Sequence, residues 1–488
     1  MPGCVGRLAH ATRPWWRFLP PAAKPRHSNP PAFGISRLWW AGLLCSAWLN
    51  SAATYAGELG YATGSYLSYE SNIDRVETNT RPELIASVFG GLSYKENTAD
   101  VTGRVYAYVE RRHFTQHTFS DDTRGYVQGS GAWTLLPKRL VWIADDTFQD
   151  VQVSVTAPNS PGNLTESNSF NTGPDLTIPL SPANAFVTGG RYGRFDIKDS
   201  NADNHRYLLY ARALHTMPSL SKLSLNYEKS RVYFEPGTAF SQAVRDDVFV
   251  HYETAAAGEG LYAGDGARID LGKSRVTQYP FDSTASSNTL DGHIVRVLLS
   301  KGVTKQFAVR ASYSDQISDT YSDLIAGIAG SSGSLAPTEG SVFIVQGTGF
   351  ATADIYHSKR ADVGFTSHGG DIEYTLQPYA RTVDFQTLDQ DDYREVGGLF
   401  FWRWLYSGAT RFDVFATAST RNYGNIDRTD RDRNYGASTE FKVNRNLTLS
   451  LLAGQAQRQS TAPGQSYVDR RAILFFGYSA NYELRFMR

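Results

Sequence analysis

The sequence predicts an all-β fold, a transmembrane antiparallel up-and-down β-barrel of about 20 strands, with a range of about 16 to 22. Three observations predict it. Apolar and polar residues alternate in stretches long enough to cross a bilayer, the links between these stretches alternate between short and long, and the chain ends on an aromatic-rich alternating segment.

The composition limits the possible functions. The 488 residues carry 48 Lys+Arg and 48 Asp+Glu, so the net charge is zero and no nucleic-acid partner is expected. With 41% hydrophobic residues the chain has enough apolar surface to fold. A single short apolar run excludes a multi-span helical membrane protein, so any membrane structure has to be β.

The N-terminal part is typical of an exported protein. An apolar stretch at residues 38–49 follows Arg37 and leads into small residues, which predicts a signal peptide cleaved after Ala56. The alternatives are an anchor helix or a buried helix, but about 12 apolar residues are few for a membrane span. We therefore expect a lead-in plus signal peptide at 1–56 and a single outer-membrane β-barrel domain at 57–488. Cys4 and Cys45 both precede the cleavage site, so the mature chain has no cysteine.

The alternation is clearest in two stretches. In 101–112 the odd positions up to Val109 are apolar or small and the even positions are polar or tyrosine, and in 411–421 the even positions are mostly apolar. The pattern recurs in 360–366, 371–383 and 446–458. A soluble β-sandwich also alternates, but its strands are shorter, whereas tilted membrane strands need about 9 to 11 residues. The length of the stretches therefore favours the barrel.

The links between strands fall into two kinds. The short ones contain Gly, Pro or Asn, as tight turns require, and lie at 136–139, 181–184, 301–304, 368–371, 407–410 and 444–446. The long ones are mostly polar and lie at 72–82, 114–123, 157–172, 234–243, 279–289, 317–357, 385–394, 424–433 and 460–468. A barrel predicts short periplasmic turns, long outer loops and both termini in the periplasm. Segments 176–180 and 261–271 are weak strands, and 317–357 either constricts the lumen or extends outward as a receptor loop.

The C-terminal segment predicts recognition by the barrel-assembly machinery. From Ala472 the even positions form one largely apolar, aromatic-rich face that ends in Tyr482, Leu484 and Phe486. This face looks like the terminal strand that the machinery recognises in outer-membrane proteins. The segment departs from that pattern in ending on Met487-Arg488 and not on the aromatic residue itself.

Several segments resemble a known family. They are Tyr69-Glu70-Ser71-Asn72-Ile73, the segment 356–365 (YHSKRADVGF), and Arg431-Asp432-Arg433-Asn434-Tyr435-Gly436 followed by 444–449 (NRNLTL). They are similar to outer-membrane β-barrel porins, a beta-barrel porin 2-like group found with exopolysaccharide-export and PEP-CTERM sorting systems. The resemblance implies an outer-membrane barrel associated with exopolysaccharide synthesis or export, and it implies no catalytic residues.

The inner face of such a barrel is expected to be polar and rich in arginine. A ring of arginines favours anions or hydrogen-bonds polyhydroxylated solutes, and the tyrosines form a track along which sugars slide. The alternative is that the charges pair and hydrate the wall while the tyrosines fill space. The candidate lumen-lining residues are Arg104, Tyr106, Tyr108, Glu110, Arg112, Arg206, Arg212, Arg245, Asp247, Arg296, Arg310, Glu373, Arg381, Arg411, Asp413 and Arg421; Tyr210 belongs to the same track.

The sequence contains no clear motif for a cofactor, a metal or an enzyme active site. Asp430 to Glu440 departs from calcium-loop spacing, no Gly-x-Ser-x-Gly segment is present, and a hydrolase triad set by geometry stays open. We therefore expect no enzyme and no cofactor, but a porin-like conduit in the outer membrane of a Gram-negative bacterium. The alternatives are a non-conducting docking barrel of an export complex and, less favoured, an outer-membrane hydrolase. The expected partners are outer-membrane lipid or lipopolysaccharide, the assembly machinery, and polysaccharide or its export components.

Overall fold

The computed structural model describes residues 57–481 apart from 199, 201, 237, 239, 255–264, 283, 324–351 and 353, and apart from the side chain of His368. The expected signal peptide with its cleavage site at Ala56 lies outside these residues, as does the expected assembly signal at Tyr482, Leu484 and Phe486. Within the described residues no helix is long and apolar enough to span a membrane.

The described chain forms one antiparallel sheet of 20 strands, which confirms the predicted count. The strands have 13 to 16 residues each. They are β1 (Glu58–Glu70), β2 (Glu83–Asn97), β3 (Val101–Phe114), β4 (Asp122–Leu136), β5 (Leu140–Gln152), β6 (Leu164–Pro179), β7 (Asn184–Ile197), β8 (Asn204–Thr216), β9 (Lys222–Phe234), β10 (Phe240–Glu253), β11 (Gly266–Pro280), β12 (Asn288–Gly302), β13 (Phe307–Asp319), β14 (Ile355–Gly369), β15 (Ile372–Phe385), β16 (Tyr393–Leu405), β17 (Thr410–Tyr423), β18 (Arg428–Lys442), β19 (Leu447–Ser460) and β20 (Tyr467–Ala480).

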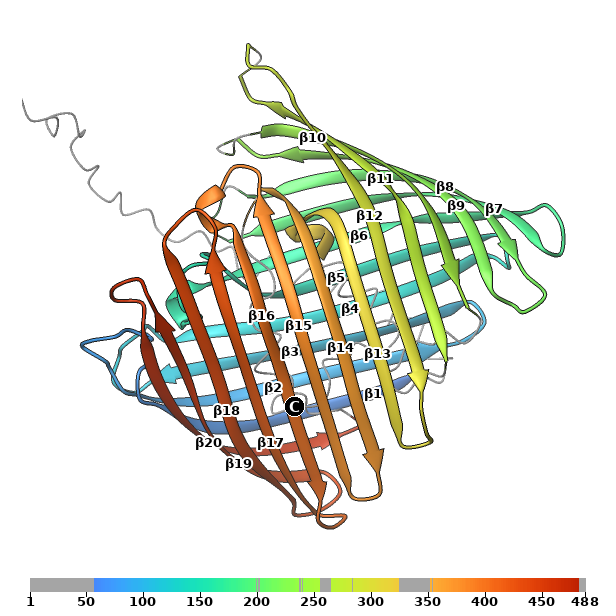
Figure 1. Ribbon diagram of the computed structural model, residues 1–488. Coiled ribbons are helices and arrows are strands. Elements are labelled where there is room, and N and C mark those ends of the chain that lie inside the picture. The colour runs from blue at the N-terminus through green and yellow to red at the C-terminus, as the bar shows by residue number, and fades with distance from the viewer. Residues whose placement is uncertain are drawn as a thin grey trace, which may run out of the picture. The chain divides into compact units, whose positions relative to one another are not determined.

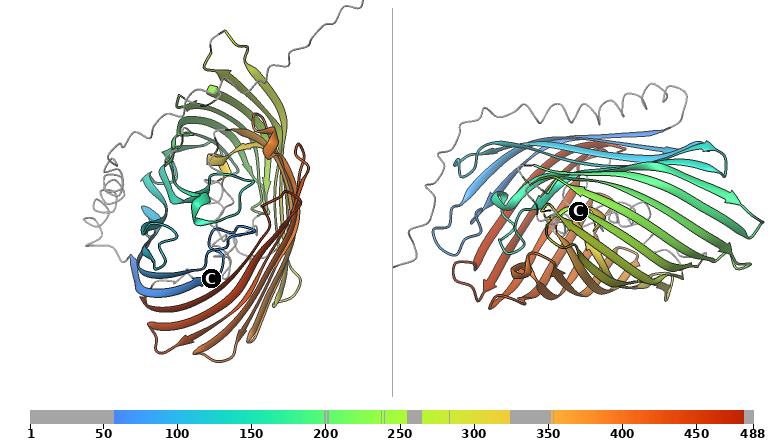
Figure 2. Two further views of the ribbon diagram at one scale, coloured as in Figure 1. Left: turned by 90° about the vertical axis from the view of Figure 1, so that its left-hand side faces the viewer. Right: turned by 90° about the horizontal axis from the view of Figure 1, so that it is seen from above.

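The sheet closes on itself. Each strand pairs with its neighbours in sequence, and β1 also pairs with β20, from Tyr61 opposite Ala480 to Glu70 opposite Arg471. Because of this closure no strand is an edge along its whole length, so most backbone amides of the wall are paired without water. Figure 1 shows the tilted strands as a curved wall, and the left view of Figure 2 looks into the ring that they form.

The links between strands occupy two ends of the barrel. One end, the turn end, carries tight turns such as the one between β14 and β15, where Gly370 adopts a φ of 65° that favours glycine. The other end, the loop end, carries most of the long links. One exception is residues 254–265, a long link at the turn end, and another is 424–427, a short link at the loop end.

Two predicted loops are partly strand. Residues 164–172 belong to β6 and residues 428–433 to β18, whereas the sequence reading placed both in loops. Apart from Leu164 and Phe170, both segments are polar on their two faces, so the two-residue alternation of hydrophobicity that marks a membrane strand is missing there.

The barrel wall has an apolar outer face. Val88, Leu209 and Val396 are 60%, 66% and 65% exposed, and similar exposed side chains recur on most strands. The inner face is polar, with buried side chains such as Asn226, Asp413 and Ser450. At the turn end, Trp404, Tyr406 and Phe412 form an aromatic cluster with ring centroids 5.2 to 6.3 Å apart. This distribution is the reverse of a water-soluble protein's.

The wall is continuous except near the loop end of β12. Its ladder with β13 runs only from Val295 opposite Asp315 to Gly302 opposite Ala308. Above it, Ile317 bends inward and packs with Val276 and Ala243. Gly292 makes room for this packing, because a Cβ there would lie 2.8 Å from the Ile317 side chain. The end of β13 therefore separates from β12 and bends toward the lumen, as the yellow strand in Figure 1 shows, while it stays paired with β14 up to Asp319 opposite Ile355.

Candidate functional site

The barrel lumen is narrowed by the loop between β5 and β6, residues 153–163, which we call the strap. The left view of Figure 2 shows this teal segment inside the ring. Its Val155 is buried in a cluster with Val383, Phe385 and Tyr423 on the far wall, together with Tyr356 and Tyr393. The strap therefore reaches from β5 and β6 to the wall formed by β14 to β17.

Arginines of the far wall hold the strap by its backbone. Arg421 Nη1 donates to the carbonyl of Val155 at 3.3 Å, and Arg428 Nη2 donates to the carbonyl of Thr156 at 2.7 Å. Arg458 Nη1 is 3.5 Å from the same carbonyl of Thr156. Hydrogen bonds from a charged donor in a buried place are among the stronger ones. These contacts fix the strap across the lumen.

Carboxylates of the same wall balance these arginines. Arg428 donates to Asp430 at 2.9 and 2.7 Å, and the Asp430 side chain is fully buried. Arg458 is paired with Asp432 at 2.7 Å, and Arg421 with Glu395 at 3.0 Å. A buried guanidinium needs such partners because an unpaired buried charge is costly. The anchor is thus a neutralised network and not a free positive patch.

The strap also holds its own shape. The Asn163 side chain accepts from the Ser154 amide at 2.9 Å and donates to the carbonyls of Ser154 and Pro158 at 2.9 and 3.1 Å. The short 3-10 turn η2 (Pro161–Asn163) begins on a proline. One buried amide therefore closes the base of the strap.

A second segment enters the lumen from β13. A helical turn at 320–323 follows that strand, and the Tyr321 ring packs against Phe195 with centroids 6.3 Å apart. Arg206 lies 3.8 Å above the Tyr321 ring and pairs with Asp319 at 2.9 Å. Burial raises the pKa of the Tyr321 hydroxyl, so this group stays neutral. The first part of the link between β13 and β14 thus lies against β6 to β8, and 324–351 lie outside the described residues.

All sixteen candidate lumen residues lie on strands, on the face opposite the exposed apolar side chains. Ion pairs on this face are Arg112 with Asp122 (2.5 Å), Arg206 with Asp319 (2.9 Å), Arg212 with Glu228 (3.5 Å), Arg245 with Asp247 (2.8 Å), Arg296 with Asp270 (2.9 Å), Arg411 with Asp413 (3.1 Å), and Glu373 with Arg403 (3.4 Å). Arg421 reaches the strap, as described above.

The other candidates have different neighbours. Tyr108 donates to Glu110 at 2.6 Å, and the Tyr106 ring meets Tyr126 edge-on at 6.4 Å. Arg381 lies over the Tyr393 ring at 5.8 Å. In the register of the sheet, Arg104 is opposite Ser130 and Arg310 is opposite Gly364. That any of these side chains line a solute path stays a prediction.

Sequence reasoning missed the strap and most of its anchor. It left open whether 317–357 constricts the lumen or extends outward as a receptor loop, and it did not include Arg428, Asp430 and Arg458 among the lumen residues. Arg428 and Asp430 were missed because 424–433 was read as a loop. The sequence does contain a signal for Arg458, because this residue ends the predicted strand 446–458 and lies at an even position, as the inward residues of that strand do.

Within the described residues no group of three metal-ligating side chains comes together. His113, His251 and His357 contact Asp121, Asp270 and Asp315 respectively. In this part of the chain none of these three histidines is hydrogen-bonded to a serine hydroxyl. At these three histidines the structure therefore places a carboxylate beside the ring and not a serine nucleophile.

No protein-family model matches the chain, and no curated protein matches its sequence. Among solved structures the chain is similar to OccK2 (OpdF) of Pseudomonas aeruginosa, with 7% identity, 88% of this chain and 99% of that chain covered, and a TM-score of 0.37. A BenF-like porin from Pseudomonas fluorescens Pf-5 has 7% identity, with 87% and 99% covered and a TM-score of 0.37. The siderophore receptor PirA of Pseudomonas aeruginosa has 12% identity, with 88% and 80% covered and a TM-score of 0.40. At these values the likenesses do not assign the chain to a family.

Proposed function

We propose that the chain is an outer-membrane barrel that conducts small polar solutes through a lumen narrowed by the strap. The observation that carries the proposal is the strap itself, a loop of the wall tied across the lumen by arginines of the opposite wall. A constriction built in this way narrows a pore and limits the size of the solutes that pass. The apolar outer face supports the membrane location.

The charges of the lumen favour a weakly selective conduit. Most of the candidate arginines have carboxylate partners within ion-pair distance, so their fields largely cancel beyond a few ångströms. This supports the alternative in which paired charges hydrate the wall. It does not favour a ring of free arginines that selects anions.

Planar-bilayer conductance of the purified full chain tests the proposal. Wild type is expected to give a small, steady current. Deleting residues 155–160, so that the strap no longer spans the lumen, is expected to raise the conductance several-fold. Shortening the link between β11 and β12 (281–287) is the matched control and is expected to leave the conductance unchanged.

The main alternative is a non-conducting docking barrel of an export complex. The density of bonds at the strap favours it, because a well-fixed strap also closes a pore. Absence of steady current in both wild type and the strap deletion would establish this alternative and refute the conduit.

The link to exopolysaccharide export is a finer proposal that rests on the family resemblance alone. We expect a strain that lacks the gene to secrete less polysaccharide, and the strap deletion to restore secretion at least as well as wild type. Normal secretion in the deleted strain would remove this part of the proposal and leave the conduit untouched.

A further inference from the structure

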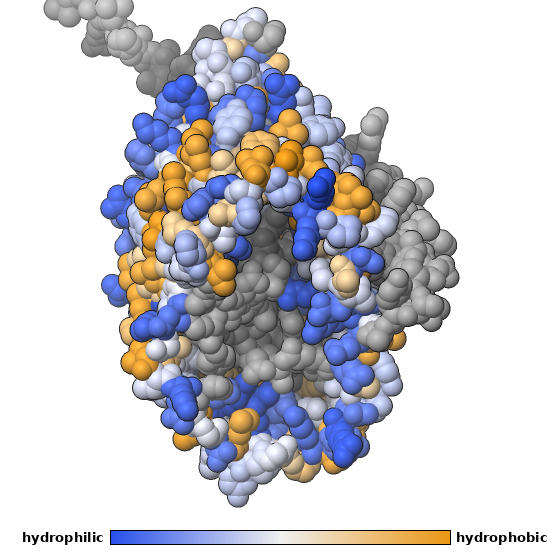
Figure 3. Space-filling model, turned by 90° about the vertical axis from the view of Figure 1, so that its right-hand side faces the viewer, coloured by the Kyte–Doolittle hydropathy of each residue, from blue (hydrophilic) through white to orange (hydrophobic). Residues whose placement is uncertain are grey.

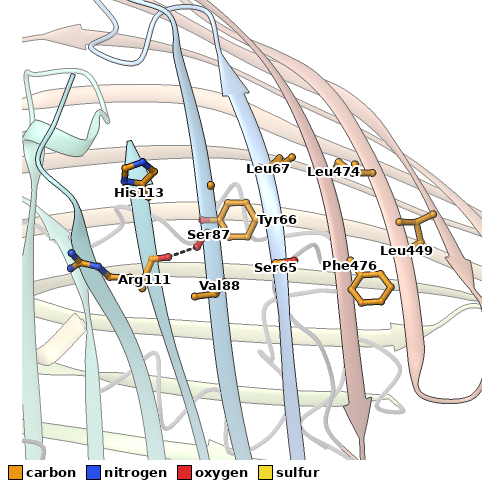
Figure 4. Close-up of a pocket in the computed structure, with 11 residues that line it drawn as sticks. Ser65, Tyr66, Leu67, Ser87, Val88, Arg111, His113, Leu449, Leu474 and Phe476 are labelled. Carbon is orange, nitrogen blue, oxygen red and sulfur yellow. Dashed lines mark hydrogen bonds between the residues drawn. The ribbon is translucent and has the colours of Figure 1, made fainter. Parts of the chain in front are cut away.

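The outer wall carries a groove across the seam where β1 meets β20. The groove has a volume of about 530 Å³. Figure 4 shows Arg111 and His113 at one side and Leu449 and Phe476 at the other. It is lined by Ser65, Tyr66, Leu67, Ala86, Ser87, Val88, Arg111, His113, Leu449, Leu474 and Phe476.

The strand register explains the groove. One row of outward positions runs Arg111, Val88, Ser65, Phe476 and Leu449 across five strands. The next row runs His113, Ala86, Leu67 and Leu474. A small residue lies inside each row, Ser65 in one and Ala86 in the other, between larger side chains. The depression follows from these two small residues and crosses the strands.

The two ends of the groove differ in chemistry. Leu449, Leu474 and Phe476 are 40 to 48% exposed and form an apolar end. At the other end Arg111 Nη1 donates to Thr123 Oγ1 at 3.2 Å, and within the described residues no carboxylate lies in ion-pair distance of it. His113 Nδ1 contacts Asp121 at 2.8 Å. The groove is therefore apolar along its length and cationic at one end.

The groove also lies where the outer face changes character. Toward the turn end the outward side chains are Val109, Leu92 and Tyr61, all of them large and exposed. Toward the loop end the next outward row still carries Leu84 and Tyr69, which are 37% and 44% exposed, and in the row after it Arg470 and Gln455 face outward and contact each other at 3.4 Å. The cationic end thus lies within two rows of the polar part of the outer face, near the level where a bilayer's headgroups meet its hydrocarbon.

We propose that this groove binds an anionic, phosphate-bearing membrane lipid, with one acyl chain across Ser65 and Ala86 and the phosphate against Arg111 and His113. The inference rests on the membrane location given under the proposed function. Apolar surface takes the chain, and a charge-assisted hydrogen bond from the Arg111 guanidinium takes the phosphate. The lipid covers the seam that closes the barrel and therefore strengthens closure.

Native mass spectrometry of the full chain with phosphatidylglycerol, and with phosphatidylcholine for comparison, tests the inference. We expect tighter retention of phosphatidylglycerol, about tenfold weaker retention in Arg111→Gln because a contact to a charged group is lost, and near loss in Ser65→Phe, which fills the groove. Arg433→Gln and Ala418→Phe are the matched controls, since these outward neighbours on β18 and β17 lie away from the groove.

Equal retention in wild type, Arg111→Gln and Ser65→Phe would overturn the inference. Arg111 is exposed, so Arg111→Gln leaves the buried side chains in place and decides the question even if Ser65→Phe fails to fold. Flotation of the wild-type chain with vesicles separates the two levels. A chain that floats and conducts but shows no lipid preference refutes the groove alone, whereas a chain that does not float refutes the proposed function.

Discussion

At the scale of single residues, the buried carboxylate of Asp430 depends most on its charged partners. It accepts from Arg428 and lies 3.5 Å from Arg458, and its side chain is fully buried. Removing its charge leaves two guanidinium groups short of a partner. The strap depends on these same two arginines. The charge of Asp430 therefore affects both the stability of the barrel and the position of the strap.

We predict that Asp430→Asn lowers the free energy of unfolding by about 3 kcal/mol, as expected when one partner of a buried ion pair is removed. Urea unfolding of the refolded barrel in detergent measures the change. Asp74→Asn is the control, because Asp74 pairs with Arg81, whose side chain is 55% exposed, and such a pair contributes less than about 1 kcal/mol. Equal losses in the two variants would contradict the assignment.

The carboxyl groups of the link between β15 and β16 respond to pH in the opposite sense from a surface ion pair. Burial raises the pKa of Asp391, and the charges of Asp392 and Asp354 raise it further. The protonated form is therefore favoured by the fold. The link is least stable at a pH above the raised pKa of Asp391. It gains stability as the pH falls through that raised pKa toward the ordinary value of about 3.9, and below the ordinary value the gain is complete.

We predict that Asp391→Asn protects residues 386–392 from hydrogen exchange at pH 7 by up to about fivefold, since screening by solvent keeps the gain below about 1 kcal/mol. The difference from wild type should vanish near pH 3, where the wild-type carboxyl is protonated. Asp427→Asn, in the adjacent exposed link, serves as control. If the variant and wild type exchange equally at pH 7 as well as at pH 3, charge repulsion at Asp391 does not destabilise the link.

At the scale of elements, the strap depends on one amide at its base. We predict that Asn163→Ala costs about 2 kcal/mol, because buried donors and acceptors of the strap lose their partner. In single-channel recordings the loosened strap should give larger and noisier current steps. Ser160→Ala is the control, because Ser160 makes no side-chain capping bond. Quiet, wild-type steps in Asn163→Ala would show that the amide does not hold the strap.

Sequence reasoning predicted the wall well and the lumen poorly. The alternation of residues such as Val105 with Tyr106 reports which side chains face lipid, because the bilayer demands apolar groups there. Val155 gives no such signal. Its partners, such as Tyr393 and Tyr423, lie more than two hundred positions away, and no period in the sequence encodes that contact.

At the scale of the whole molecule, the seam between β1 and β20 decides whether the barrel exists. Inside the seam Phe475 packs on Phe89 with ring centroids 5.4 Å apart, and Tyr66 completes the cluster. The neighbouring Phe476 points outward and is 48% exposed. Of these two adjacent phenylalanines, Phe475 therefore packs inside the seam that closes the barrel, whereas Phe476 lies on the outer surface.

We predict that Phe475→Ala lowers the free energy of unfolding by about 3 to 5 kcal/mol, the usual cost of a buried phenylalanine. The compact, heat-modifiable form on gels should disappear at a lower temperature. Phe476→Ala should cost clearly less, because no interior cavity forms. If both variants melt alike, the inner cluster does not stabilise the seam.

The strap is gripped through the carbonyl oxygens of Val155 and Thr156, and every amino acid supplies a carbonyl. Evolution is thus free to rewrite almost all of that loop while the bore keeps its width. In an alignment of homologues this loop would therefore score as variable. In distant homologues the conserved feature should instead be the arginines on the strands that face the strap.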